Sequence, residues 1–422
     1  MAVLETSWRL DEAPGLLGFC NQMITAEREL GHDMTEPARL AWDAAQALEA
    51  DNPERAIRLV ARARHALRMC PRLPDWPYVE PTDLDGIKAE MPSLKLPVIT
   101  VDGGNVRDRI LGGWLGKNIG GALGGPIEGW TRQRIVETYG EITDYVQKPP
   151  STLNDDTAYE IAALHVLEEK GRDFTACDIG LEWVERIPQS YTAEHVAIEN
   201  MKRGIMPPEC AIIDNPYREW IGGQMKGEVW GLLCPGRPAD AVDYAYRDAI
   251  VAHERNGVYG ELYDAALIAA AFAESDPRRL LEGGLGFVPA RSRFAEVVRD
   301  SIRWCDESRS WQEAWGKAEA SHAGRYHPDH TFPAVCAVVI GLLFGDGDFE
   351  RSTCITATCG LDTDCSAGQT AAIMGTILGA SRLPAKWKDP IGDDFETFVV
   401  GYERLKTSEV AEWTHRLGKK LA

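Results

Sequence analysis

Apolar residues along this 422-residue chain recur mostly with the three- and four-residue spacing of amphipathic helices. The period-2 alternation of half-buried strands is scarce, so most regular segments favour helix. The clearest helical segments cover 153–167, 239–253, 262–273, 333–344 and 367–380. We therefore predict an all-α fold.

The N-terminal segment, residues 1–70, has a helical pattern of its own. Two stretches, 37–50 and 53–69, each place a proline near the first turn, where its missing N–H is not needed. Asn52 stands where the second stretch needs an N-cap. We predict a helical hairpin, in which one face of the second helix carries Ala56, Leu59, Val60, Ala63 and Leu67.

Prolines separate this segment from the rest of the chain. Residues 71–98 contain six of them. Proline fixes the backbone without donating a hydrogen bond, so this composition predicts an ordered, extended connector. Residues 99–422 then form the main domain.

Two acidic clusters about two hundred residues apart each stand where a long helix rich in small residues is expected to begin. The clusters are Asn154-Asp155-Asp156-Thr157 and Asp362-Thr363-Asp364-Cys365. Either cluster alone reads as a helix N-cap with acids in the first turn. Small residues let helices pack closely and bury these ends, where paired carboxylates need a cation. Together the clusters therefore predict a magnesium site.

Three further motifs accompany the acidic clusters. Before them, ILGGWLGKNIGGALGGPIE over residues 110–128 ends in Glu128. Between them stand WIGGQMK over 220–226, and then Ala252-His253 with NGVYG over 256–260. In this order the motifs resemble those of the ADP-ribosylglycohydrolase family, over roughly residues 105–400.

The resemblance implies an orthogonal helical bundle, to which the N-terminal hairpin is an addition. It implies that 99–422 is a catalytic domain binding two Mg²⁺ ions, with Mn²⁺ as an alternative metal. The implied metal ligands are Asn154, Asp155, Asp156, Asp362, Asp364 and Cys365.

The implied reaction is hydrolysis of the ribosyl bond of an ADP-ribosylated protein or small molecule. Catalytic roles fall on Glu128, Asp155 and Asp156, with Glu128 on a mobile loop suited to gating and acid/base work. The implied substrate contacts are Gly222, Gly223, Gln224, His253 and Tyr259.

Plainer interpretations of these residues stay open. Glu128 alone reads as a loop carboxylate, and Gly222-Gly223 alone as a turn. His253 reads as a helix-end residue and Tyr259 as a packed aromatic. The string at 325–330 (RYHPDH) is predicted to be a solvated loop near the cleft rather than a metal site, because Pro328 breaks helical ligand spacing.

Two positions depart from the family pattern. Asn154 stands where the family has Ser or Thr, and Cys365 stands where it has Thr. An amide oxygen still binds magnesium, but a neutral thiol is a poor ligand for a hard cation. The departures predict a weaker metal position, a softer ion such as manganese, or a shifted substrate range. Two alternatives follow: a hydrolase of another N- or O-riboside, or a non-catalytic ligand-binding protein.

Composition excludes some function classes. The formal charge of −20 argues against non-specific nucleic-acid binding, which needs a basic surface. The ten cysteines include no CxxC pair, which fits reduced, buried thiols better than zinc or disulfides. No apolar run has membrane-spanning length and the N-terminus lacks a signal-peptide pattern, so we expect no membrane contact and a cytoplasmic protein.

Overall fold

The computed structural model describes residues 12–92, 105–322 and 324–421. The chain divides into two compact units, one of Met1–Pro77 with Asp214–Tyr217 and the other of Tyr78–Ile213 with Arg218–Ala422. The division after Pro77 falls inside the segment predicted as a connector. Residues 1–11 of the predicted hairpin and 93–98 of the predicted connector lie outside the described residues.

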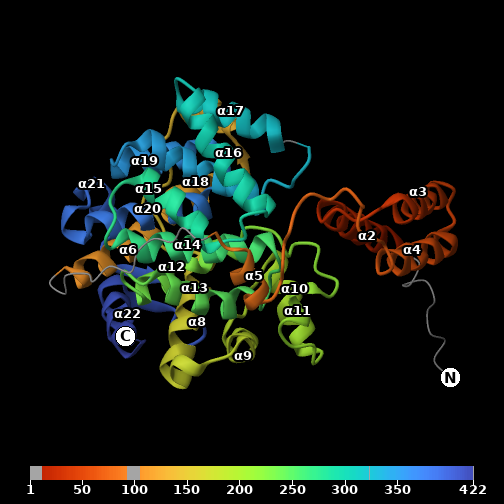
Figure 1. Ribbon diagram of the computed structural model, residues 1–422, viewed down its shortest axis with the longest axis horizontal. Helices are drawn as coiled ribbons and strands as arrows, with labels where there is room; N and C mark the ends of the chain where they lie inside the picture. Colours follow the sequence, from red (N-terminus) through yellow and green to blue (C-terminus); the bar gives the residue numbers. More distant parts are fainter. Residues whose placement is uncertain (1–11, 93–104, 323, 422) are drawn as a thin grey trace. The chain divides into compact units, whose positions relative to one another are not determined.

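The described part of the first unit, from residue 12 on, contains three helices, α2 (Ala13–Glu29), α3 (Thr35–Glu49) and α4 (Pro53–Leu67), labelled in Figure 1. Helices α3 and α4 correspond to the two predicted stretches, whereas α2 is an addition to the predicted hairpin. Asn52 caps α4 by accepting a hydrogen bond from the backbone N–H of Arg55. The buried face of α4 carries the five apolar residues that its periodicity predicted.

The segment predicted as an extended connector contains a short helix, α5 (Leu84–Glu90). The Asp83 side chain caps it by accepting from the backbone N–H of Gly86. Ile87 is fully buried and anchors the turn. The proline density therefore described only part of the segment, because Asp83 to Glu90 contains no proline to stop a helix.

Where the structure describes the second unit, its regular secondary structure is helical apart from two small antiparallel sheets of two strands each, β1 (Trp130–Thr131) with β2 (Gly360–Leu361) and β3 (Asp394–Glu396) with β4 (Arg404–Lys406). The all-α prediction is confirmed. None of the described helices is both long and apolar enough to cross a membrane. The α-helices are α6 (Val106–Gly124), α7 (Arg132–Tyr139), α8 (Asp155–Lys170), α9 (Ala176–Arg186), α10 (Thr192–Lys202), α11 (Glu209–Ile212), α12 (Gly227–Leu233), α13 (Pro238–Ala249), α14 (Asn256–Ala271), α15 (Pro277–Gly284), α16 (Arg293–Glu307), α17 (Trp311–His322), α18 (Thr331–Gly345), α19 (Phe349–Cys359), α20 (Thr363–Leu378), α21 (Ala385–Ile391) and α22 (Thr407–Leu421).

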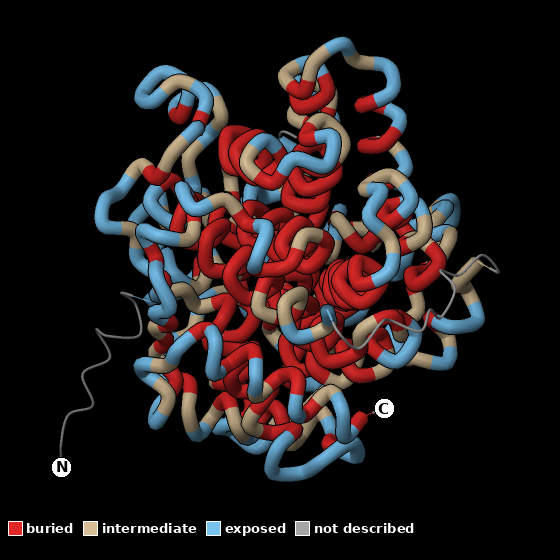
Figure 2. Tube along the Cα trace, turned by 90° about the vertical axis from the view of Figure 1, so that its left-hand side faces the viewer, coloured by how far each residue is buried: buried red, intermediate tan, exposed pale blue. Residues whose placement is uncertain are grey.

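The core of this unit is built around helices that are buried on every side. All residues of α14, and those of α20 from Thr363 to Ile377, are buried. Such helices have little amphipathic pattern, because a helix surrounded by protein is apolar or small all round. Figure 2 shows continuous buried segments in red in the interior.

Helices α6 and α20 pack side by side and antiparallel, with glycines at the points of closest approach. A Cβ added at Gly116, Gly120 or Gly124 would overlap the backbone of Ala371, Ala367 or Thr363, respectively. This register, repeated every four residues, places the end of α6 beside the start of α20. It thereby brings the residues after α6 to the second acidic cluster.

Gly120→Ala is expected to destabilise the protein by about 1–3 kcal/mol or more, because the added methyl group forces two packed backbones apart. Gly316→Ala, in α17, is the matched control, since a Cβ there meets nothing within 4 Å. This control is expected to be neutral or stabilising by up to about 1 kcal/mol through helix propensity. Urea denaturation of both variants measures the difference. Equal stability of the two would contradict the close α6–α20 packing.

Candidate functional site

The loop after α6 is tied to the residues before α20 by the β1–β2 pair. Trp130 is paired with Leu361, and the N–H of Gly129 donates to the Leu361 carbonyl over 2.8 Å. Gly360 has φ +83, and its Cβ position is filled by the Trp130 backbone, so only glycine fits there. The pairing therefore holds Glu128, just before β1, close to Asp362, just after β2.

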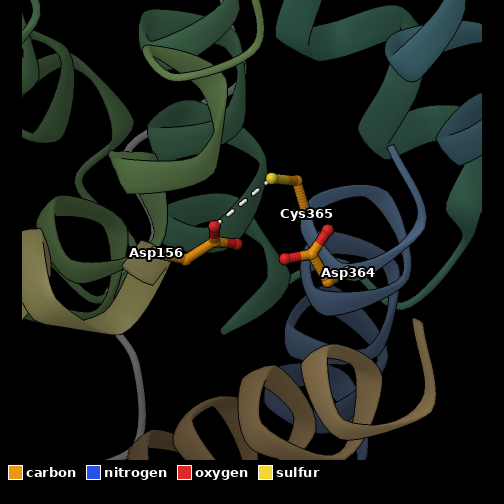
Figure 3. A group of neighbouring side chains, drawn as sticks. All are labelled: Asp156, Asp364 and Cys365. Atoms are coloured by element: carbon orange, nitrogen blue, oxygen red, sulfur yellow. Dashed lines mark hydrogen bonds between the residues drawn. The ribbon is translucent and has the colours of Figure 1, made fainter. Parts of the chain in front are cut away.

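The two acidic clusters meet at this point. Asp155 and Asp156 lie in the first turn of α8. Asp362 stands at the N-cap position of α20 without a side-chain capping hydrogen bond, and Asp364 lies in the first turn of that helix. One ligand atom from each of Asp156, Asp364 and Cys365 lies within 4.8 Å of the others. Figure 3 shows these three side chains converging from the two helices. The predicted convergence of segments two hundred residues apart is therefore present in the fold.

Negative charge in the cluster is not balanced by the protein alone. Among the described residues, no hydrogen-bond partner is found for the buried Oδ1 atoms of Asp362 and Asp364. Burial, followed by Asp156 and Glu128, raises the pKa of Asp364 to about 8. Burial and the neighbouring Asp364 raise the pKa of Asp362 well above its usual value. Buried, unpaired carboxylate oxygens of this kind fit a hard divalent cation.

Asp156 forms a hydrogen bond with the side chain at each of the two positions that depart from the family pattern. Asn154 caps α8, its Oδ1 accepting from the Asp156 N–H at 2.9 Å. The Cys365 thiol donates to Asp156 Oδ1 over 3.3 Å, as the dashed line in Figure 3 marks. A thiol that donates is protonated and neutral, and such a group is a weak ligand for magnesium.

Cys365→Thr is expected to tighten Mg²⁺ binding by at least about tenfold, the scale on which partners of metal ligands change affinity. A hydroxyl suits a hard cation, and Asp156 Oδ1 offers it an acceptor, so it is not left unpaired. Calorimetric Mg²⁺ titration of variant and parent measures the change. A variant destabilised by about 1–3 kcal/mol with unchanged Mg²⁺ affinity would instead identify Cys365 as an apolar filler.

Two cavities of about 420 and 410 Å³ flank the cluster and share four residues, Glu128, Asp155, Tyr191 and Asp364. The first cavity also takes in Trp220, Gly222 and residues of the acidic cluster. The second is lined in addition by Gln147, Ser151, Leu153, Gln189 and Phe398, among others. A substrate with its central group at the carboxylates thus has room on both sides.

Glu128 stands at the rim shared by the two cavities. Partial burial of its carboxyl, with the nearby charges of Asp155, Asp156 and Asp329, raises its pKa to about 7. A carboxyl group with a pKa near neutrality can both accept and donate a proton at physiological pH. The position and the pKa both favour the predicted acid/base role.

Of the predicted substrate contacts, Gly222 lies on a cavity wall and the other four do not lie on the walls of these two cavities. A Cβ at Gly222 would overlap the Glu194 carboxylate, which also lines the first cavity. Gly223 instead packs against the Gly257 carbonyl. This glycine pair therefore accommodates neighbouring protein groups, and only Gly222 borders the cavity.

The other three residues are buried in the protein. Gln224 donates to Gln369 Oε1 and accepts from Thr331. Tyr259 is fully buried and its hydroxyl donates to the Pro81 carbonyl, as in the packed-aromatic alternative. His253 Nε2 lies 3.6 Å from Glu194 Oε1, behind the cavity wall. The packing gives these residues supporting positions in this conformation.

Several residues at the site had not been identified from the sequence. Glu194, Tyr191 and Asp329 line the first cavity. Asp329 belongs to the 325–330 segment, which is predicted to be a solvated loop near the cleft. His330 of that segment is fully buried. Lys117, in the middle of α6, contacts Asp156 at 3.0 Å. Its one sequence signal is a lone lysine inside a stretch of glycine and apolar residues.

The sequence model of the ADP-ribosylglycohydrolase family matches residues 102–420. The chain belongs to the ADP-ribosylglycohydrolase family. The ADP-ribosyl-(dinitrogen reductase) glycohydrolase of Rhodospirillum rubrum is 25% identical over 297 residues, which cover 68% of this chain and 90% of that protein. An uncharacterized protein of Archaeoglobus fulgidus is 25% identical over 303 residues, covering 66% and 90%.

A solved structure of an ADP-ribosylglycohydrolase-related protein complex has the same fold, with a TM-score of 0.54 and 20% sequence identity. The match covers 76% of this chain and 100% of that one. The family resemblance inferred from the motifs is thus confirmed. A hydrolase of the ADP-ribosylglycohydrolase type follows from family membership.

Proposed function

We propose that this protein is a metal-dependent hydrolase of a ribosyl bond, with an ADP-ribosyl group on a protein or small molecule as its first candidate substrate. The proposal is carried by the position of Asp155 and Asp364 on the wall common to the two cavities, with Asp362 beside them in the first cavity. The buried, unpartnered Oδ1 atoms of Asp362 and Asp364 are its strongest single feature among the described residues. The all-oxygen carboxylate set suits Mg²⁺, with Mn²⁺ as an alternative.

The carboxylates would bind the cation, and the cation would in turn bind the sugar. A bound divalent cation would supply positive charge for the ribose hydroxyls and would lower the pKa of a water molecule. Asp155, which lines both cavities, would orient the group on either side of the cluster. The cavities on the two sides then accept the leaving group and the rest of the substrate.

Glu128 is assigned the proton transfers. It takes a proton from the attacking water, whose oxygen bonds to the anomeric carbon as the bond to the leaving group breaks. The electron pair of that bond goes to the leaving group, which is then protonated. The pKa of about 7 places Glu128 near the balance point for both transfers.

The proposal is tested by a hydrolysis screen over arginine-, serine- and phosphate-linked ADP-ribose and simple ribosides, with Mg²⁺ and with Mn²⁺. Release of free ADP-ribose or ribose is measured by chromatography. Glu128→Gln is the companion variant, expected to bind metal normally but to lose at least about 10²-fold in rate. Absence of cation-dependent hydrolysis of every substrate would count against an enzyme and favour the non-catalytic alternative.

The charge of the cavities favours a second candidate, hydrolysis of an N- or O-riboside without a diphosphate. Among the described residues that line the two cavities, none is a lysine, arginine or histidine. The first cavity is lined by Glu128, Asp155, Glu194, Asp329, Asp362 and Asp364. Glu194 fills the space beside Gly222, which is one of the substrate contacts that the family resemblance implies. A phosphate there would face a carboxylate.

Competition separates the two substrates. If the substrate is an ADP-ribosyl group, free ADP-ribose inhibits at far lower concentration than ribose or an uncharged nucleoside. If it is a simple riboside, the order is reversed. Glu194→Gln removes the repulsive charge without changing the shape of the side chain. This variant is expected to improve ADP-ribose binding in the second case.

A further inference from the structure

Lys117 is a fully buried cation placed directly behind the acidic cluster. Its Nζ lies 3.0 Å from Asp156 Oδ2, and donates to Glu228 Oε1 over 2.7 Å and to the Met225 carbonyl over 2.9 Å. The Met225 and Glu228 oxygens accept hydrogen bonds, whereas Asp156 Oδ2 forms an ion pair with the ammonium group and no hydrogen bond. The charge of Lys117 is therefore held by protein groups next to a residue predicted to bind metal.

The position of the ammonium group is fixed by four helices. Lys117 belongs to α6, and Gly368 in α20 leaves room for its stem, since a Cβ there would lie 3.3 Å from Lys117 Cδ. Its partner Glu228 belongs to α12 and interacts electrostatically with Asp264 of α14, which accepts a hydrogen bond from Gln369 of α20 over 2.6 Å. This cation is thus a permanent part of the core.

Both carboxylate oxygens of Asp156 are engaged by side chains. Oδ2 faces Lys117, and Oδ1 accepts from the Cys365 thiol over 3.3 Å. Asp156 is fully buried and is not among the residues lining the two cavities, in contrast to Asp155, Asp362 and Asp364. A cation in the first cavity therefore meets these three carboxylates, and Asp156 has only Oδ1 left to offer it, because Oδ2 faces Lys117.

We infer that the site holds one divalent cation per chain and that the Lys117 ammonium group occupies the place of the second. The bound cation has Asp155, Asp362, Asp364 and Asp156 Oδ1 as its candidate ligands. The inference rests on the proposed metal-dependent function, and departs from the two ions implied by the family resemblance. A second divalent cation bound through Asp156 Oδ2 would lie next to the buried Lys117 ammonium group, and the two positive charges would repel each other.

Mn²⁺ titration of the full chain tests the inference independently of activity. Bound metal is counted by elemental analysis after gel filtration and by the electron paramagnetic resonance of free Mn²⁺. At saturation we expect one ion per chain, with the spectrum of an isolated Mn²⁺. Two ions per chain, or an exchange-coupled pair, would overturn the inference. Zero ions would instead refute the proposed metal-dependent function.

The variant Lys117→Met/Glu228→Gln removes the ammonium group together with the charge of Glu228, so Glu228 is not left as an unpaired buried carboxylate. With Asp156 Oδ2 released, the number of Mn²⁺ ions bound is expected to rise from one to two per chain. Glu228→Gln alone is the matched control and should stay at one. A double variant that folds and still binds one ion with unchanged affinity would contradict a role for Lys117. If it does not fold, the count on the parent protein decides.

Discussion

Asp364→Asn is expected to lower kcat/KM by at least about 10³-fold while the fold is retained, because it removes a charge on which metal binding and transition-state stabilisation both depend. Asparagine keeps the shape of the side chain, so no hole opens at the start of α20. Hydrolysis rates and circular dichroism measure the two effects. Asp389→Asn, at an exposed position in α21, is the control and should be unaffected.

A stability measurement strengthens the interpretation of this variant. Asp364 is buried among other carboxylates, and its charge is costly when no cation is present. In chelator at pH 8, Asp364→Asn should therefore melt at a higher temperature than the parent, and should no longer respond to Mn²⁺. Asp155→Ala is also expected to lose hydrolysis. Near-normal turnover in either variant would show that the site lies elsewhere.

The main features of the site could be predicted because local sequence patterns determine them. Each acidic cluster is followed by a helix of small residues, and the glycines of α6 repeat every four residues opposite the backbone of α20. These patterns dictate which helices pack closely and which of their ends meet. The burial of Asp362 and Asp364 at that meeting point follows from the packing.

The predicted substrate contacts were less reliable, because motif position does not reveal which group faces a cavity. Gly223 and Gln224 stand one and two residues after Gly222, yet face the Gly257 carbonyl and Gln369. The orientation of the Tyr259 side chain depends on the Pro81 carbonyl, a hydrogen-bond acceptor far away in the sequence. Such long-range partners decide the orientation of a side chain, and no local pattern contains them.

Helix α2 was missed for a different reason. Its sequence contains Gly15 and Gly18, each of which lowers helix propensity by about 1 kcal/mol relative to alanine. The helix is stabilised by burial of Leu17, Cys20 and Ile24 in the core of the first unit. Tertiary packing thus outweighs the local preference, which a single segment of sequence does not show.

The chelated protein is expected to lose stability as the pH rises from 6.5 to 8, by on the order of 5 °C in Tm. Burial raises the folded-state pKa of Asp364 to about 8 and that of Glu128 to about 7, above their unfolded values of about 4. The folded state therefore binds these protons more tightly. Stability is highest below the unfolded pKa and falls as the pH rises through the folded one.

A bound cation compensates the same charges, so the stabilisation by Mn²⁺ should grow over the window in which the chelated protein weakens. Burial is the main cause that lowers the pKa of His322 to about 4. The contribution of His322 to stability therefore falls as the pH decreases below 6.5, which is opposite to the effect of the carboxyl groups. The pH window begins at 6.5 for this reason. The quantity to measure is the difference in Tm with Mn²⁺ and with chelator at each pH. In Asp364→Asn this difference should be small and nearly independent of pH. A parent protein whose Tm is the same with Mn²⁺ and with chelator at pH 8 would favour the non-catalytic alternative, because a site that binds only the folded state must stabilise it.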